Sequence, residues 1–172
     1  MSGASPAAVT LLMVSALATV VYGQSFTVTA EIVEGCALVG TSDSSGLDFG
    51  TLNFGTYPAI YSGNVTASAV GAGGPVQVEC TSGLTMQVDV DGGQHLSGSQ
   101  RRLLHGGSGD VVPYALFTTA SHAVPIPVST PVSVVIPPAG VITLPIFGVA
   151  TLSGTGLTPG AYTDLLQVTL SW

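Results

Sequence analysis

Apolar and polar residues alternate with a period of two along much of this chain. In the first such stretch the apolar side chains share one face: Phe26, Val28, Ala30 and Ile32. Threonine and glutamate occupy the positions between them, which is the pattern of a half-buried β-strand. This alternation therefore predicts a β-strand that begins near residue 24 and includes Phe26, Val28, Ala30 and Ile32.

Further short apolar runs follow, and each ends at turn-forming residues such as Gly, Pro or Asp. These runs are residues 47–54, 65–70, 76–80, 86–90, 111–118, 131–136 and 141–149. No segment after residue 23 shows sustained helical periodicity. Many short strands at this spacing predict a single antiparallel β-sandwich domain.

The last run has the clearest alternation, and it follows a Pro159-Gly160 turn signal. One face carries Tyr162, Asp164, Leu166, Val168, Leu170 and Trp172. The sequence thus predicts a closing strand with one strongly apolar face.

The first 23 residues differ from the rest. Residues 7–21 are apolar with small side chains, and Gly23 offers a small residue before a cut. We interpret residues 1–23 as a secretory signal, although no Lys or Arg precedes the apolar run. A cut after Ala18 also fits, and a retained membrane anchor is the alternative.

The chain carries few charges. Charged residues make up 6% of the sequence, and the formal net charge is −7. Such a surface repels nucleic acid and anionic lipid. After residue 23, no apolar stretch has the roughly 18 uninterrupted residues that a membrane-spanning helix needs.

Cys36 and Cys80 are the two cysteines of the sequence. An even count in an exported chain favours a disulfide, which would stabilise the fold by about 4 kcal/mol. Two thiols this far apart, without clustered histidines, are a poor zinc site. The chemistry predicts an oxidising compartment, the periplasm or the cell surface.

The histidines are the natural candidates for catalysis: His95, His105 and His122. None belongs to a recognisable hydrolase, metalloprotease or phosphate-binding motif. Each has Ser, Gly or Ala close by, so we expect exposed loop histidines. The sequence predicts neither an enzyme nor a bound cofactor or metal.

Asp89 and Asp91, followed by Gly92-Gly93, superficially suggest a calcium loop, but the later ligands of an EF-hand are absent. We expect a hairpin turn there.

Two polar features elsewhere invite a functional interpretation. Arg101 and Arg102 are the only basic residues, and they could bind a carboxylate or keep one sheet edge soluble; we favour the structural role. Residues 64–66 form a glycosylation sequon but also fit the start of a strand.

Several short motifs occur in a fixed order after the first strand. They are Gly35-Cys36, FGTLNFG at residues 49–55, Cys80, DGG at 91–93, Arg102-Leu103, PIFG at 145–148 and GAYTDLLQVTL at 160–170. Together they resemble the spore coat protein U family, which includes the pilin subunits of archaic chaperone–usher pili. The resemblance covers essentially all of the chain after the signal.

The resemblance implies an incomplete immunoglobulin-like sandwich, residues 35–172, completed by donor-strand exchange. Residues 24–34 would be the donor strand. The wall of the acceptor groove would be formed by Tyr162, Leu166, Val168, Leu170 and Trp172. The implied partners are identical or homologous pilus subunits, a periplasmic chaperone and an outer-membrane usher, with no nucleic acid or small-molecule substrate. The implied route runs through the periplasm to a surface fibre that serves adhesion or biofilm formation.

Two other functions stay open at this stage. One is a spore or cell coat protein of the same fold that associates without an usher. The other is a secreted carbohydrate-binding module, which should expose a row of aromatic side chains. Trp172 is the only tryptophan and the tyrosines are scattered along the sequence, so we rank this function lower.

Overall fold

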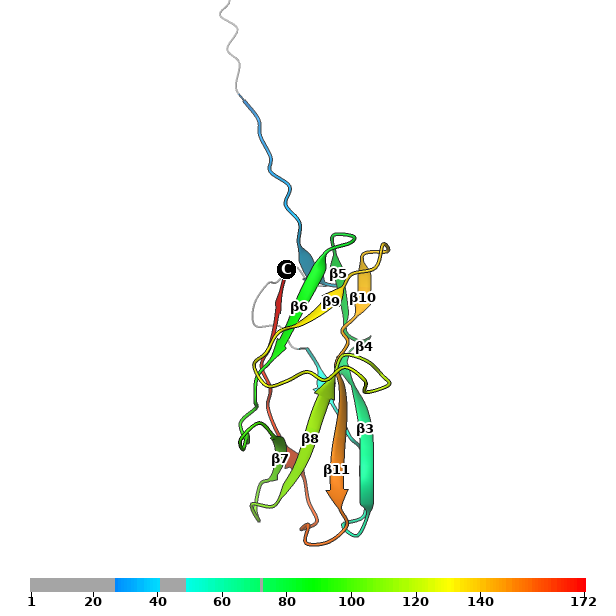
Figure 1. Ribbon diagram of the computed structural model, residues 1–172, viewed down its shortest axis with the longest axis vertical. Coiled ribbons are helices and arrows are strands. Elements are labelled where there is room, and N and C mark those ends of the chain that lie inside the picture. The colour runs from blue at the N-terminus through cyan, green and yellow to red at the C-terminus, as the bar shows by residue number, and fades with distance from the viewer. Residues whose placement is uncertain (1–26, 41–48, 72) are drawn as a thin grey trace, which may run out of the picture. The chain divides into compact units, whose positions relative to one another are not determined.

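The computed structural model describes residues 27–40, 49–71 and 73–172 (Figure 1). The proposed signal segment and Phe26 lie outside these residues. The chain divides into two units, Met1–Ile32 and Val33–Trp172, and every named strand belongs to the second.

The described part of the second unit consists of β-strands joined by turns, without a helix. All strand pairs are antiparallel. The strands are β1 (Cys36–Leu38), β2 (Thr51–Leu52), β3 (Ser62–Gly71), β4 (Gly74–Pro75), β5 (Gln77–Cys80), β6 (Thr85–Val90), β7 (Arg101–His105), β8 (Val111–Phe117), β9 (Val132–Val135), β10 (Val141–Thr143), β11 (Phe147–Ser153), β12 (Tyr162–Thr163) and β13 (Val168–Ser171). The prediction of an all-β antiparallel fold is confirmed.

The strands form one large sheet and two small ones. The large sheet has the order β12-β7-β8-β11-β3-β2, with β4 added beside β3. Figure 1 shows its central strands β7, β8, β11 and β3 side by side. The small sheets have the orders β1-β5-β10 and β13-β6-β9.

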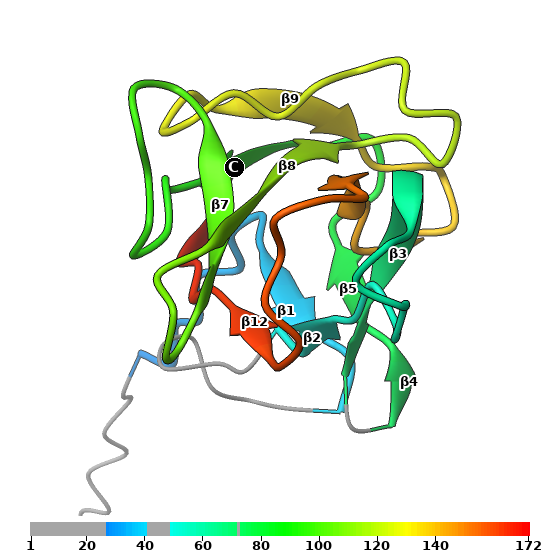
Figure 2. The same cartoon turned by 90° about the horizontal axis from the view of Figure 1, so that it is seen from below.

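One hydrophobic core contains side chains from all three sheets. Figure 2 shows the strands of these sheets arranged around a common centre. On β6, Met86, Val88 and Val90 are completely buried. On β8, every second residue is buried: Val112, Tyr114 and Leu116. Each such side chain stabilises the fold by about 1.5–3 kcal/mol relative to an exposed one, so the alternation seen in the sequence selects which face of each strand points inward.

Two predicted strands are each divided between sheets. The run at 141–149 becomes β10 and β11, which lie in different sheets on either side of Pro145. The closing run becomes β12, paired with β7, and β13, paired with β6. Periodicity alone missed this because a strand that changes sheets keeps its alternation while it changes its partner.

The expected hairpin after Asp91 is wrong for the same reason. β6 and β7 lie in different sheets, so residues 91–93 connect sheets rather than paired strands. The sequence pattern also does not predict β1, β4 and β7. Of the predicted run at 47–54, residues 49–54 are described, and Thr51–Leu52 is the part of them that forms a strand.

The described part of the leading segment is not the half-buried strand that its alternation predicts. Residues 27–34 are exposed and belong to no strand. Ile32 is 95% exposed and Val28 is 78% exposed. A strand needs a ladder partner, and no described strand of the same chain pairs with these residues.

Candidate functional site

The second unit has a groove of about 790 Å³ among its described residues. One side is formed by β1 and by residues 49–52 and 54, and the other by residues 164–170 and Trp172. Side chains from the core, including Val78, Tyr114 and Ile146, also line it. The groove therefore separates the first strand of the domain from its last.

Both strands that border the groove have an open edge. In the described structure β13 pairs only with β6, and β1 pairs only with β5. The amide of Val39 donates to Gln77 O and that of Thr81 to Gly35 O, so alternate residues of β1 face β5. Cys36 and Leu38 therefore present their main-chain groups to the other side, which is the side without a partner strand.

The same argument applies to β13. Asp91 N donates to Gln167 O at 3.0 Å, which places the main-chain groups of Gln167 on the β6 side. Val168 and Leu170 consequently direct their N–H and C=O groups away from β6. Two rows of main-chain donors and acceptors thus border one groove, an arrangement suited to an added β-strand.

The groove is also largely apolar. Leu52 and Phe54 are half-buried, and Leu165 and Trp172 are 66% and 55% exposed. Exposed apolar surface that is clustered in this way is typical of interaction sites.

Four of the five residues assigned to the groove wall line the groove: Leu166, Val168, Leu170 and Trp172. Tyr162 does not. It lies on β12, where its ring is centred 5.1 Å from the ring of His105 and its hydroxyl donates to Thr158 O.

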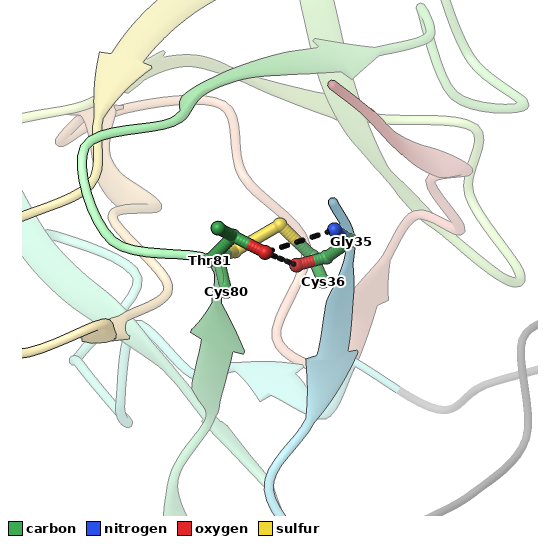
Figure 3. Close-up of a disulfide and its surroundings, with 4 residues drawn as sticks. All are labelled: Gly35, Cys36, Cys80 and Thr81. Atoms are coloured by element: carbon green, nitrogen blue, oxygen red, sulfur yellow. Dashed lines mark hydrogen bonds between the residues drawn. A yellow bond between two sulfur atoms is a disulfide. The ribbon is translucent and has the colours of Figure 1, made fainter. Parts of the chain in front are cut away.

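A disulfide joins Cys36 on β1 to Cys80 on β5, as the cysteine count predicts (Figure 3). Beside it, Gly35 N donates to Thr81 Oγ1 at 3.1 Å and Thr81 N donates to Gly35 O at 2.9 Å. β1 is short and open on one edge, so these bonds fix the groove border where the leading segment joins the domain.

Two carboxylates, those of Asp91 and Asp164, hold the opposite border of the groove in place through hydrogen bonds. Asp91 Oδ1 accepts hydrogen bonds from Gly93 N and Gln167 N, both at 3.0 Å. Asp164 accepts from Gln94 N at 2.9 Å and from the Tyr114 hydroxyl at 2.7 Å. Burial, together with this bond to Asp164, raises the pKa of Tyr114 far above its usual value, so the phenol stays protonated.

Gly93 is required by this arrangement. Its φ is +73°, and a Cβ at this position would overlap the Asp164 carboxylate. The DGG motif therefore supports the segment at 164–167. Asp89 lies apart on β6, and its buried Oδ1 has no hydrogen-bond partner among the described residues.

Arg101 does not keep a sheet edge soluble, because its side chain is only 3% exposed. Its guanidinium donates to four main-chain carbonyls, those of Val90, Asp91, Ile126 and Pro127, at 2.6–3.0 Å. Burial lowers its pKa, while Tyr114 and nearby aspartates oppose the effect. Arg102 is half-buried and donates to His95 O at 2.9 Å.

The histidines are half-buried rather than exposed. His105 ends β7, and its Nδ1 accepts from Ser108 N at 2.8 Å, so it organises a turn. His122 packs on Phe117, with ring centroids 5.2 Å apart. Asn64 of the sequon lies within β3, where its Oδ1 accepts a bond from the Thr151 hydroxyl.

The tyrosines are less scattered in space than in sequence. Tyr57 and Tyr61 are exposed, and their rings are centred 5.0 Å apart. They form a pair on one loop rather than the row that a carbohydrate-binding face would show.

Two kinds of feature are absent from the described residues. These residues contain no group of three potential metal ligands. They also contain no helix that is long and apolar enough to cross a membrane.

A family model described as the spore coat protein U domain matches residues 23–169. The chain belongs to the spore coat protein U domain family. The match begins before the described leading segment and ends within β13, so it includes the β1 border of the groove and residues 164–169 of the opposite border.

Other comparisons add less. A search of curated proteins found no match. One matching solved structure is the CsuC–CsuE chaperone–tip adhesion subunit pre-assembly complex from archaic chaperone-usher Csu pili of Acinetobacter baumannii. The sequence identity is 16% and the TM-score 0.47; the match covers 82% of this chain and 40% of that chain. This chain thus spans less than half the length of the chain that it matches in that structure.

Proposed function

We propose that this chain is a structural subunit of a bacterial surface fibre and that it polymerises by donor-strand exchange. Residues 24–34 of one copy enter the groove of a neighbouring copy and lie between β13 and β1. The observation that carries this proposal is the groove bordered by two open strand edges. Main-chain hydrogen bonds to both edges would give affinity, and alternate side chains in the groove would set the register.

The leading segment has the composition that such a groove requires. Val28 and Ile32 are exposed, and the apolar residues of their face occur at every second position from Phe26 to Ile32. Burying Phe26, Val28, Ala30 and Ile32 would contribute about 5–9 kcal/mol before entropy losses. This gain supports a stable, non-covalent link between subunits.

An open groove of this kind is also a hazard, because it exposes apolar surface and unpaired strand edges together. We therefore infer that a periplasmic chaperone lends a strand to the groove after export, and that an outer-membrane usher exchanges it for residues 24–34 of the next subunit. The product is a fibre on the cell surface with a role in adhesion or biofilm formation.

The test is electron microscopy of cells that produce the chain with its chaperone and usher. Val28→Asp should abolish fibres and leave the chaperone complex intact, because it alters the donor and not the groove. Thr29→Asp adds the same charge one residue away on the other face and should leave fibres in place. Normal fibres from Val28→Asp would refute the proposed donor face.

The family description supports a second candidate of the same class, a coat protein that associates through the same groove without an usher. Deleting the usher gene separates the two functions. Loss of surface material would support the pilus, and unchanged surface assembly would support the coat.

A further inference from the structure

The last strand changes sheets between residues 164 and 167. Before this point β12 pairs with β7, and after it β13 pairs with β6. Asp164, Leu166 and Gln167 nevertheless line the groove. A groove wall without a ladder at its midpoint needs other partners to hold its position.

Side chains provide those partners at both ends of the segment. At one end, Asp164 accepts bonds from Gln94 N and the Tyr114 hydroxyl, at 2.9 and 2.7 Å. At the other end, Asp91 N donates to Gln167 O, and Gln167 N donates to Asp91 Oδ1, each at 3.0 Å. In a regular antiparallel pair, Gln167 N would donate to the main-chain oxygen of Asp91. Here it donates to the side-chain Oδ1 of the same residue.

Arg101 explains the replacement. Its Nε donates to Asp91 O at 2.7 Å, so that carbonyl is engaged by the core. The carboxylate of the same residue takes over as acceptor for Gln167. The groove wall is thereby linked through Asp91 to a buried guanidinium that also holds Val90, Ile126 and Pro127.

We propose that Asp91 and Asp164 form a two-point catch that holds residues 164–167 in the strand-accepting position before any donor strand arrives. The inference rests on the proposed function, because it concerns how the groove is prepared for a donor. A wall that is not held must be ordered when the donor binds, and the apparent affinity then falls in proportion to the fraction of molecules with the wall in place. Both aspartates are positioning residues in this scheme.

The test measures binding of a labelled synthetic peptide of residues 24–34 to the chain of residues 24–172. Asp91→Ala should weaken binding about tenfold, which corresponds to about 1.4 kcal/mol, mainly through slower association. Asp91→Asn should restore most of the affinity, since its amide oxygen can still accept the Gln167 bond. The rescue separates the catch from a general requirement for negative charge.

Asp110→Ala is the matched control. It removes the same charge from a carboxylate that accepts bonds from Thr158 N and the Ser108 hydroxyl, and Asp110 does not line the groove. Peptide affinity should be unchanged in this variant. Wild-type affinity in a folded Asp91→Ala chain would overturn the catch.

Amide hydrogen exchange of Gln167 in the peptide-free chain gives a second readout. We expect protection in the wild type and in Asp91→Asn, and exchange at least tenfold faster in Asp91→Ala. If Asp91→Ala does not fold, the wild type and Asp91→Asn still decide, because rapid exchange in both refutes the catch. Absence of peptide binding to the wild type would instead refute the proposed function while leaving the exchange result to stand.

Discussion

Replacing Ile32 by aspartate in the donor peptide tests the strand-exchange scheme at a single side chain. Ile32 is 95% exposed in the monomer, so nearly all of its surface is available for burial. Burying an isoleucine side chain contributes about 1.5–3 kcal/mol, which corresponds to about a tenfold to more than a hundredfold change in affinity. A carboxylate in an apolar groove adds a desolvation penalty to that loss.

The chain carries its own reporter for this measurement. Trp172 is the only tryptophan, lines the groove and is 55% exposed. A peptide of residues 24–34 contains no tryptophan, so a titration can be followed by intrinsic fluorescence. A donor that covers Trp172 should shift its emission to shorter wavelengths.

The control peptide carries Thr29→Asp, which has the same added charge on the face that points out of the groove. We expect it to bind within about threefold of the wild type, since exposed substitutions change free energies by about 0.5 kcal/mol or less. If both substitutions weaken peptide binding equally, or if neither weakens it, the assignment of Ile32 to the inserted face is refuted.

Three further predictions concern the domain itself. Reducing the Cys36–Cys80 disulfide, which spans 44 residues, should lower the free energy of unfolding by about 4 kcal/mol, measured in denaturant with and without reductant; an unchanged midpoint would contradict this. Arg101→Met should lower the free energy of unfolding by about 3 kcal/mol or more, because four main-chain carbonyls lose their hydrogen-bond donor. Arg102→Met, which removes one such bond, should lower it by about 1 kcal/mol. Similar losses in both variants would argue against the buried network. Hydrogen bonds from Thr158, then Ser108, lower the pKa of Asp110. The ionised Asp110 carboxylate therefore stabilises the fold above about pH 4, and this stabilisation is lost as the pH falls through the lowered pKa. Acid unfolding curves of the wild type and Asp110→Asn that coincide would refute this prediction.

The residues in contact with the catch show where sequence reasoning failed. Arg101 looked like a surface charge and is among the most buried side chains. The DGG motif looked like a hairpin and supports the groove wall through Gly93 and Asp164. One signal could have pointed to them, because in a chain with 6% charged residues each ionisable group is more prone to have a structural role.

The alternation of residues along the chain determined a great deal by itself. It selected strands over helices, and it specified the inward face of β6 and the inward face of the closing segment, because side-chain direction in a strand depends only on local backbone geometry. The two cysteines specified their disulfide because no other pairing within the chain was possible.

Pairing is what only the tertiary structure decided. The division of the closing run between β12 and β13, the open edges of β13 and β1, and the groove between them depend on which strands lie adjacent. Hydrogen bonds between strands join residues far apart in sequence, and the same alternating pattern is compatible with many partners or with none. The leading segment illustrates this, since its pattern is that of a strand and its partner is absent from the described structure of its own chain.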